Sequence, residues 1–172
     1  MTEHLTGGPS RPILFLSLTQ PWATLAAHSL KLVETRSWST PYRGRLGIHA
    51  SASFPRWARE LCLEEPFRAA LLRLRIPYLS DLPLGKLLAV GELASCGRIV
   101  GADREHSWID DGGGRRTLIG EPERSFGDYT PGRSAWIMRD MRPLPAPIDY
   151  KGRLGLFQVE PALLNLAAEG AR

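Results

Sequence analysis

The chain has 172 residues, of which 43% are hydrophobic and 23% are charged. This length and this balance predict one globular domain with a core of its own, and they exclude a largely disordered chain. No apolar run reaches the roughly 18 residues that a membrane helix needs, and the first residues lack the basic and then apolar pattern of a secretion signal. A cytoplasmic protein with no membrane partner is therefore expected.

Basic residues outnumber acidic ones and give a net charge of +4. Three of the 22 basic residues are lysines, which leaves 19 arginines, the side chain that suits bidentate phosphate contacts and stacking on bases. This excess favours a polyanionic partner such as RNA, although genomic codon bias explains the same arginine content. Cys62 and Cys96 lie far apart and form no CxxC motif, so reduced thiols are predicted, and no metal or other cofactor is expected.

The first elements expected are a strand and a helix. Residues 1–11 contain Gly and Pro without periodicity and predict a flexible N-terminal tail, so a single domain is expected over residues 12–172. Residues 13–18 are apolar and predict a strand. Pro21 suits the first position of a helix, where its missing N–H is not needed, and Trp22 is expected to pack in the core from that helix.

A strand with a high density of charge is expected next. In LVETRSW, residues 32–38, side chains alternate between two faces, and Glu34, Arg36 and Trp38 share one of them. Lys31 precedes this strand, and its long stem reaches over the same face. The pattern predicts a cleft that carries a Lys-Glu-Arg cluster, while an ion network that only braces the fold explains the same spacing.

A second polar strand face is expected after a turn. Residues 41–44 (PYRG) are a turn signal, and residues 45–50 predict the strand that follows. His49 and Ser51 lie on the side of this strand that is expected to open on the cleft. The alternative for His49 is a histidine whose hydrogen bonds are satisfied by other groups and which has no catalytic role.

The middle of the chain is expected to hold helices and a long strand. A helix is predicted from residue 54 to residue 76, and Pro66 divides it into two pieces. Residues 86–100 predict a long strand whose one acidic residue is Glu92. The glycines of this strand indicate bulges or the close approach of another backbone.

The last third of the chain begins with a polar, glycine-rich segment, residues 101–131, which predicts a long surface loop or lid. Residues 134–142 and 155–159 predict strands, and Pro161 starts a C-terminal helix. Several short strands with two or three helices, and without regular βαβ alternation, predict an α+β domain or a small barrel with helices at its rim.

Two segments together resemble one known family. SLKLVETR, residues 29–36, resembles the GxKxxExR motif of the ASCH domain, a branch of the PUA-like superfamily. Lys31, Glu34 and Arg36 match the motif, and a serine replaces its leading glycine. Residues 125–157 are similar to the distal part of bacterial and phage ASCH proteins. The resemblance implies a PUA-like small β-barrel with helices packed at its rim and a cleft around the motif that binds RNA or a nucleotide or nucleoside.

The resemblance also implies an enzymatic alternative. One bacterial branch of the family hydrolyses the acetyl amide of N4-acetylcytidine with a lysine, a threonine nucleophile and a glutamate from a later strand. Lys31 and Glu92 match the lysine and the glutamate, whereas Glu34 stands in the place of the threonine. The alternative is therefore a hydrolase, either an amidohydrolase on N4-acylated cytidine or a ribonuclease, with Lys31, Glu34 and Glu92 as catalytic residues.

Ligand-binding candidates are the aromatic and polar side chains around the motif, because aromatic rings stack on bases and arginines contact phosphates. They are Arg36, Trp38, Tyr42, Arg43, Arg45, His49, Ser51 and Trp136. Core packing is the alternative for each aromatic residue, and a solvated turn is the alternative for Arg43 and Arg45. A third possible function is a protein-interaction adaptor that uses residues 101–131, and the sequence predicts no oligomeric state.

Overall fold

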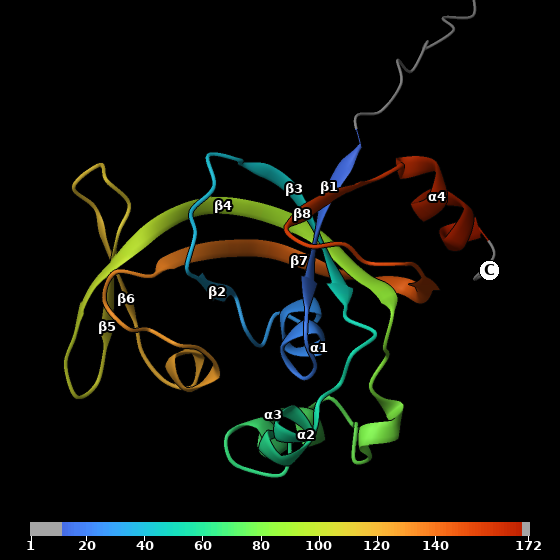
Figure 1. Cartoon of the computed structure of the whole chain (residues 1–172), viewed down its shortest axis with the longest axis horizontal. Coiled ribbons are helices and arrows are strands. Elements are labelled where there is room, and N and C mark those ends of the chain that lie inside the picture. Colours follow the sequence, from blue (N-terminus) through green and yellow to red (C-terminus); the bar gives the residue numbers. More distant parts are fainter. Residues whose placement is uncertain (1–11, 170–172) are drawn as a thin grey trace, which may run out of the picture.

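The computed structural model describes residues 12–169, and the tail expected at residues 1–11 lies outside this range. One mixed sheet dominates the fold, with the strand order β2-β7-β4-β3-β1-β8, and the β5-β6 hairpin extends from β4 (Figure 1). The strands are β1 (Ile13–Leu18), β2 (Val33–Arg36), β3 (Gly44–Ala50), β4 (Lys86–Ala102), β5 (Ser107–Asp110), β6 (Arg116–Ile119), β7 (Ser134–Asp149) and β8 (Leu156–Val159).

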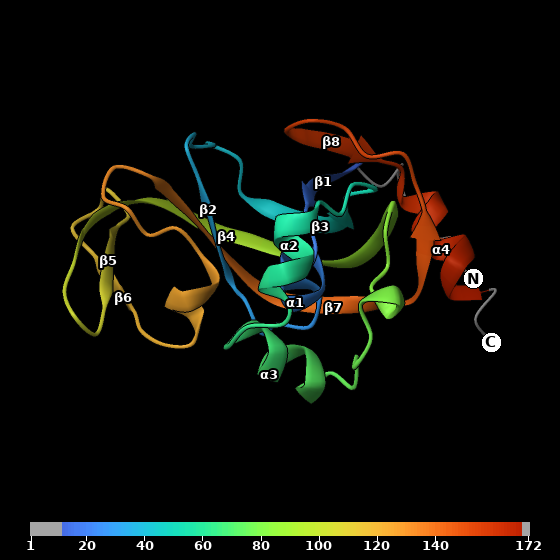
Figure 2. The ribbon, with the colours of Figure 1, turned by 60° about the horizontal axis from the view of Figure 1, so that its bottom comes forward.

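Short helices accompany the sheet, and α1, α2 and α3 lie together on one side of it (Figure 2). They are α1 (Trp22–Ala27), α2 (Arg56–Leu61), α3 (Phe67–Arg73), α4 (Pro161–Glu169), and the 3-10 helices η1 (Leu79–Asp81) and η2 (Glu123–Phe126). Pro66 separates α2 from α3 and Pro161 begins α4, as predicted. Among residues 12–169, no helix has the length and apolar character needed to cross a membrane.

The long strands β4 and β7 form the centre of the sheet. They pair in antiparallel fashion with several register shifts, and these shifts lie close to the glycines of β4. A Cβ atom at Gly91 would lie 2.8 Å from the Arg139 carbonyl oxygen, and one at Gly97 would lie 2.6 Å from the Asp110 carbonyl oxygen. The predicted close approach of another backbone at these glycines is therefore confirmed.

The architecture is α+β, as expected. The pairing path begins at β2 and ends at β8, and these two strands do not pair with each other among the described residues. The sheet is therefore open at this point, and closure into the expected small barrel is not established. β1 and β3 are parallel neighbours, whereas the other pairs along the path are antiparallel.

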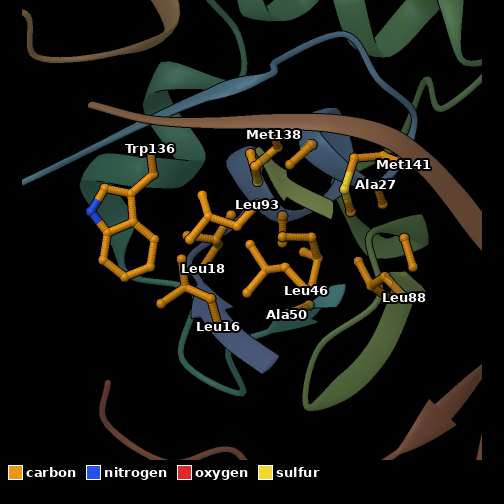
Figure 3. Close-up of a cluster of buried hydrophobic side chains, with 14 residues drawn as sticks. Leu16, Leu18, Ala27, Leu46, Ala50, Leu88, Leu93, Trp136, Met138 and Met141 are labelled. Carbon is orange, nitrogen blue, oxygen red and sulfur yellow. The ribbon is translucent and has the colours of Figure 1, made fainter. Parts of the chain in front are cut away.

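The main core lies between the sheet and α1. Side chains of β1, β3, β4 and β7 meet there, and Leu46, Leu93 and Trp136 are fully buried (Figure 3). A Cβ atom at Gly47 would lie 2.2 Å from the Phe15 ring, so β1 and β3 pack closely at this position. This core fixes the position of β1, and a second cluster, in which Val33 packs with Ile99 and Ala135, fixes the position of β2. These two strands carry the candidate site.

Residues 101–131 differ from the predicted loop. Strand β4 continues to Ala102, and the hairpin β5-β6 and the helix η2 follow, so much of the segment is regular structure. Its glycines cluster at residues 112–114, the turn between β5 and β6. The glycine-rich composition of this turn therefore hid two strands, because four residues are too few to show a clear alternation.

Candidate functional site

A pocket of about 460 Å³ opens where the end of β1 meets β2, α2 and η2. A volume of this size lies within the range of pockets that bind small molecules. Most of its lining comes from segments far apart in the sequence. The lining residues are Ser17, Leu18, Thr19, Trp22, Glu34, Thr35, Arg36, Trp57, Leu61, Phe67, Ser125, Phe126, Gly127 and Asp128.

Aromatic rings form one wall of the pocket. The Trp22 ring lies 5.9 Å from the Trp57 ring and contacts the Phe67 ring edge-on at 5.5 Å. Phe67 in turn contacts Phe126 at 5.2 Å, and the Trp22 indole N–H donates a hydrogen bond to the Phe126 carbonyl. Trp57 is 58% exposed, whereas the other rings are buried or half-buried. The wall is therefore a packed cluster that leaves one indole free to stack on a ligand.

Charged side chains of β2 form the opposite, polar part of the pocket. One carboxylate oxygen of Glu34, Oε2, lies 3.2 Å from the Lys31 ammonium, and the other, Oε1, lies 3.1 Å from Arg36 Nε. Glu34 and Arg36 line the pocket, and both are partly exposed there. The predicted shared face of Glu34 and Arg36 is present, and the two side chains form one ion pair on it.

Lys31 lies behind this ion pair and does not line the pocket. Its side chain is 1% exposed, and its ammonium group donates to the Val33 carbonyl besides pairing with Glu34. A buried ammonium is stable only when opposite charge and hydrogen bonds compensate for the hydration it gives up. Lys31 therefore fixes the position of the Glu34 carboxylate from below.

A second carboxylate, Glu123 of η2, anchors the start of β2. It accepts hydrogen bonds from the backbone N–H groups of Leu32 at 2.7 Å and Val33 at 3.1 Å, and from the Tyr129 hydroxyl at 3.4 Å. Burial raises the pKa of Glu123, and the nearby charge of Lys31 opposes that shift. Burial and the Glu123 charge raise the pKa of Tyr129. Part of the segment expected to be a lid is thus built into the site.

Thr35 ties the following turn to β2. Its hydroxyl accepts a hydrogen bond from the Asp128 N–H at 3.2 Å, and Arg133 donates to the Thr35 carbonyl at 3.2 Å. Arg133 also pairs with the Asp128 carboxylate at 3.3 Å. Hydrogen bonds from Thr130 lower the pKa of Asp128, so a charged carboxylate lies at the rim of the pocket.

Ser17 of β1 connects the pocket to a buried histidine. Its carbonyl accepts a hydrogen bond from Arg36 at 3.1 Å, and its hydroxyl lies 2.9 Å from His49 Nδ1. His49 Nε2 lies 3.0 Å from the Tyr150 carbonyl, which can only accept, so Nε2 carries the proton and neutral Nδ1 accepts from Ser17. His49 is 1% exposed and burial lowers its pKa. The histidine supports the site from inside and does not line the pocket.

Glu92 lies apart from Lys31, and the pairing that the catalytic hypothesis needs is not formed. Its carboxylate binds Arg139 at 2.8 Å and 3.1 Å, and it lines a different hollow with Arg45 and Arg142. Register explains the difference, because Glu92 is opposite Arg45 on β3 and Arg139 on β7. The sequence does not specify this register through the bulges of β4.

The three aromatic candidates lie outside the pocket lining. Trp136 is fully buried in the main core, so the prediction that it contacts a ligand is wrong. Trp38 is 39% exposed and packs edge-on against Trp136 at 4.6 Å. Tyr42 packs partly against the main core and donates a hydrogen bond to the Arg45 carbonyl. Core packing was the alternative for these rings, and it accounts for Trp136 and Tyr42.

The remaining candidates of the turn and of β3 also lie away from the pocket. Arg43 donates to the carbonyls of Thr40 at 2.8 Å and Cys96 at 3.3 Å, and so fastens the turn to β4. Arg45 is exposed beside Glu92. The backbone N–H of Ser51 donates to the Leu18 carbonyl at the end of β1. Of the predicted ligand-binding set, Arg36 alone lines the pocket.

Several pocket residues were not identified from the sequence. Trp57 falls within the helix predicted over residues 54–76, and Trp22 was expected to pack in the core. Phe126 and Asp128 lie in the segment interpreted as a loop. One signal was available, because Arg56 and Arg59 flank Trp57 on a short helix and make an indole there an unusual core residue. Phe126 and Asp128 gave no comparable signal.

Comparison with known proteins agrees with the motif around Lys31. The sequence model of the ASCH domain family matches residues 16–111, more than half of the chain. Over 82 residues, the chain is 43% identical to activating signal cointegrator 1 of Homo sapiens and 42% identical to activating signal cointegrator 1 of Mus musculus. Each alignment covers 47% of this chain and 14% of the relative, so the similarity concerns a small part of those proteins. The chain belongs to the ASCH domain family.

Proposed function

We propose that this ASCH protein binds RNA or a nucleotide, with one base held in the pocket at the end of β1. The observation that supports the proposal best is the pairing of an aromatic wall with an ionic floor in one pocket. Bases are flat and apolar on their faces and carry donors and acceptors on their edges, so they match both surfaces. The net charge of +4 favours a polyanion in the same way.

The base stacks on the exposed ring of Trp57, an interaction worth roughly 1 to 3 kcal/mol. Its edge meets the Glu34 carboxylate and the Arg36 guanidinium, which line the same pocket. Each carboxylate oxygen accepts more than one hydrogen bond, so Glu34 bonds an amino or imino group of the base while still paired with Lys31 and Arg36. Arg36 donates to a base oxygen or nitrogen.

Lys31 acts in this proposal as a positioning residue. Its ammonium is buried and holds Glu34 at 3.2 Å, which keeps the acceptor in one orientation before the ligand arrives. Residues 12–172 serve as one ASCH domain that presents this pocket, with the open sheet as a PUA-like framework.

A hydrolase remains the second candidate because a lysine and a glutamate lie beside the pocket. Hydrolysis of an acylated cytidine or of RNA requires a group that activates water. Glu34 is the partly exposed carboxylate in position for it, whereas Lys31 is occupied by Glu34 and the Val33 carbonyl. Incubation with N4-acetylcytidine and with short RNA, analysed by chromatography, distinguishes this function: turnover that Glu34→Gln removes would replace the binding proposal.

The binding proposal is tested by titrating a short single-stranded RNA of mixed sequence into the wild type, Trp57→Ala and Trp38→Ala. Both variants remove a partly exposed indole, but only Trp57 lines the pocket. We expect Trp57→Ala to weaken binding about tenfold or more and Trp38→Ala to leave it within about twofold. Equal effects of the two variants, or no binding by the wild type, would contradict the proposal.

A further inference from the structure

The connection between β7 and β8 lies against β1 next to the pocket. The Tyr150 carbonyl accepts from His49 at 3.0 Å, and the Arg153 carbonyl lies 3.3 Å from the Ser17 hydroxyl. Ser17 lines the pocket, so this loop, residues 150–155, is attached directly to the pocket edge. The His49 hydrogen bond therefore fixes the loop backbone at Tyr150, and the Ser17 hydroxyl, whose proton is donated to His49, contacts the loop at Arg153.

The loop fits this place only because its middle residue is glycine. A Cβ atom at Gly152 would lie 2.3 Å from the His49 ring and 2.8 Å from the Ser17 hydroxyl. Real Cβ atoms essentially never approach other atoms so closely, and His49 is fully enclosed. The backbone of the loop therefore rests on the same Ser17 and His49 pair that supports the pocket floor.

Two cations flank this glycine. Lys151 and Arg153 are both exposed, and neither forms an ion pair with any residue in the described part of the chain. Arg36 adds a third cation nearby, because its guanidinium donates to the Ser17 carbonyl at 3.1 Å. Arg36 is paired with Glu34 at 3.1 Å, so the unpaired positive charge next to the pocket comes from Lys151 and Arg153. The pocket lining itself contains two carboxylates, Glu34 and Asp128.

We propose that Lys151 and Arg153 form a phosphate-binding subsite for the nucleotide whose base enters the pocket. This inference rests on the proposed function, because the phosphate reaches the loop as part of that ligand. Unpaired cations on a backbone held by the His49 hydrogen bond and by close packing against Ser17 bind phosphate with little loss of loop entropy. The glycine, the half-buried Ser17 and the buried His49 give the loop its fixed position, and the flexible stems of the two cations reach the phosphate.

The subsite is tested with the double variant Lys151→Ala/Arg153→Ala and a matched control, Arg104→Ala/Arg115→Ala. Each double variant removes two exposed positive charges, and the control residues lie in and next to the β5-β6 arm and outside the pocket lining. The ligands are nucleosides and their 5′-monophosphates, and their binding is measured by the change in tryptophan fluorescence. We expect the first variant to weaken monophosphate binding about tenfold and to leave nucleoside binding unchanged, and the control to change neither.

Titration of short single-stranded RNA at several salt concentrations gives a second readout. The slope of log affinity against log salt should fall by about 0.7 for each phosphate that the protein no longer neutralises, and only in the Lys151 and Arg153 variant. Equal weakening by the two double variants, or equal affinity of wild type for nucleoside and monophosphate, would overturn the subsite while leaving the base pocket intact. Absence of nucleoside and RNA binding by wild type would overturn the proposed function itself.

A single substitution tests whether the position of the loop matters. Gly152→Ala should displace the loop and weaken monophosphate binding without affecting nucleosides, because both cations remain but their backbone moves. Gly113→Ala is the control, since a Cβ atom there meets only the Asp111 side chain at 3.4 Å. Monophosphate binding unchanged in Gly152→Ala, in a protein that melts as a folded domain, would refute the role of a preset loop.

Discussion

Two clusters of acidic and basic side chains lie on the same sheet, and their environments differ sharply. In the Lys31 cluster, Lys31, Glu34 and Arg36 are 1%, 13% and 28% exposed. In the Glu92 cluster, Glu92 and Arg139 are 37% and 60% exposed. Exposed ion pairs compete with water and contribute little to stability, whereas a buried charge depends on its partners. The same residue types therefore form a fixed pocket floor in one cluster and a surface pair in the other.

The largest effect expected from this difference is on stability. Lys31→Met removes the buried ammonium and leaves Glu34 with one partner fewer, so the free energy of unfolding should fall by about 3 to 5 kcal/mol. Arg139→Met, which breaks the exposed pair with Glu92, should change it by less than about 1 kcal/mol. Urea denaturation of both variants measures the contrast. Similar losses would mean that burial does not separate the two clusters.

A second contrast is between the carboxylate of Glu123, which is held inside the site, and that of Glu92, which is paired at the surface. Glu123→Gln exchanges one acceptor oxygen for a donor opposite backbone N–H groups, which should cost about 1 to 3 kcal/mol. Because burial raises the pKa of Glu123 above 4.5, the folded protein holds this proton more tightly than the unfolded chain. The stability from Glu123 is thus present below pH 4.5 and declines as the pH rises through the folded pKa.

The cost of Glu123→Gln should accordingly be greatest in acid and smaller at neutral pH, as measured by urea denaturation across this range. Glu92→Gln is the control, since that carboxylate is partly exposed and paired at the surface. A cost that grows from acid to neutral pH would show that the charge of Lys31 outweighs burial at Glu123.

The sequence predicted the parts of the site that depend on short spacing. Alternation in residues 32–38 placed Glu34 and Arg36 on one face, and their ion pair confirms that face. The arginines around Trp57 indicate an exposed indole, but they do not predict its place in the pocket, which depends on residues of β1, β2 and η2 far away in the sequence. Glu92 was misplaced for a related reason, since register shifts between β4 and β7 decide which side chains it meets.

The smallest effect expected separates a buried histidine from an exposed one. Burial lowers the pKa of His49 from 6.5, so the unfolded chain binds the proton more tightly than the folded protein. Its contribution to stability is therefore complete above pH 6.5 and is lost as the pH falls through the folded pKa. His49→Gln should flatten this part of the dependence of stability on pH, which urea denaturation across this range measures. His106→Gln is the matched control, because it removes an imidazole that is 41% exposed. If the free energy of unfolding of both variants depends on pH as it does in the wild type, protonation of His49 does not limit the stability of the pocket floor. The Ser17 and His49 pair that supports residues 150–155 then tolerates protonation.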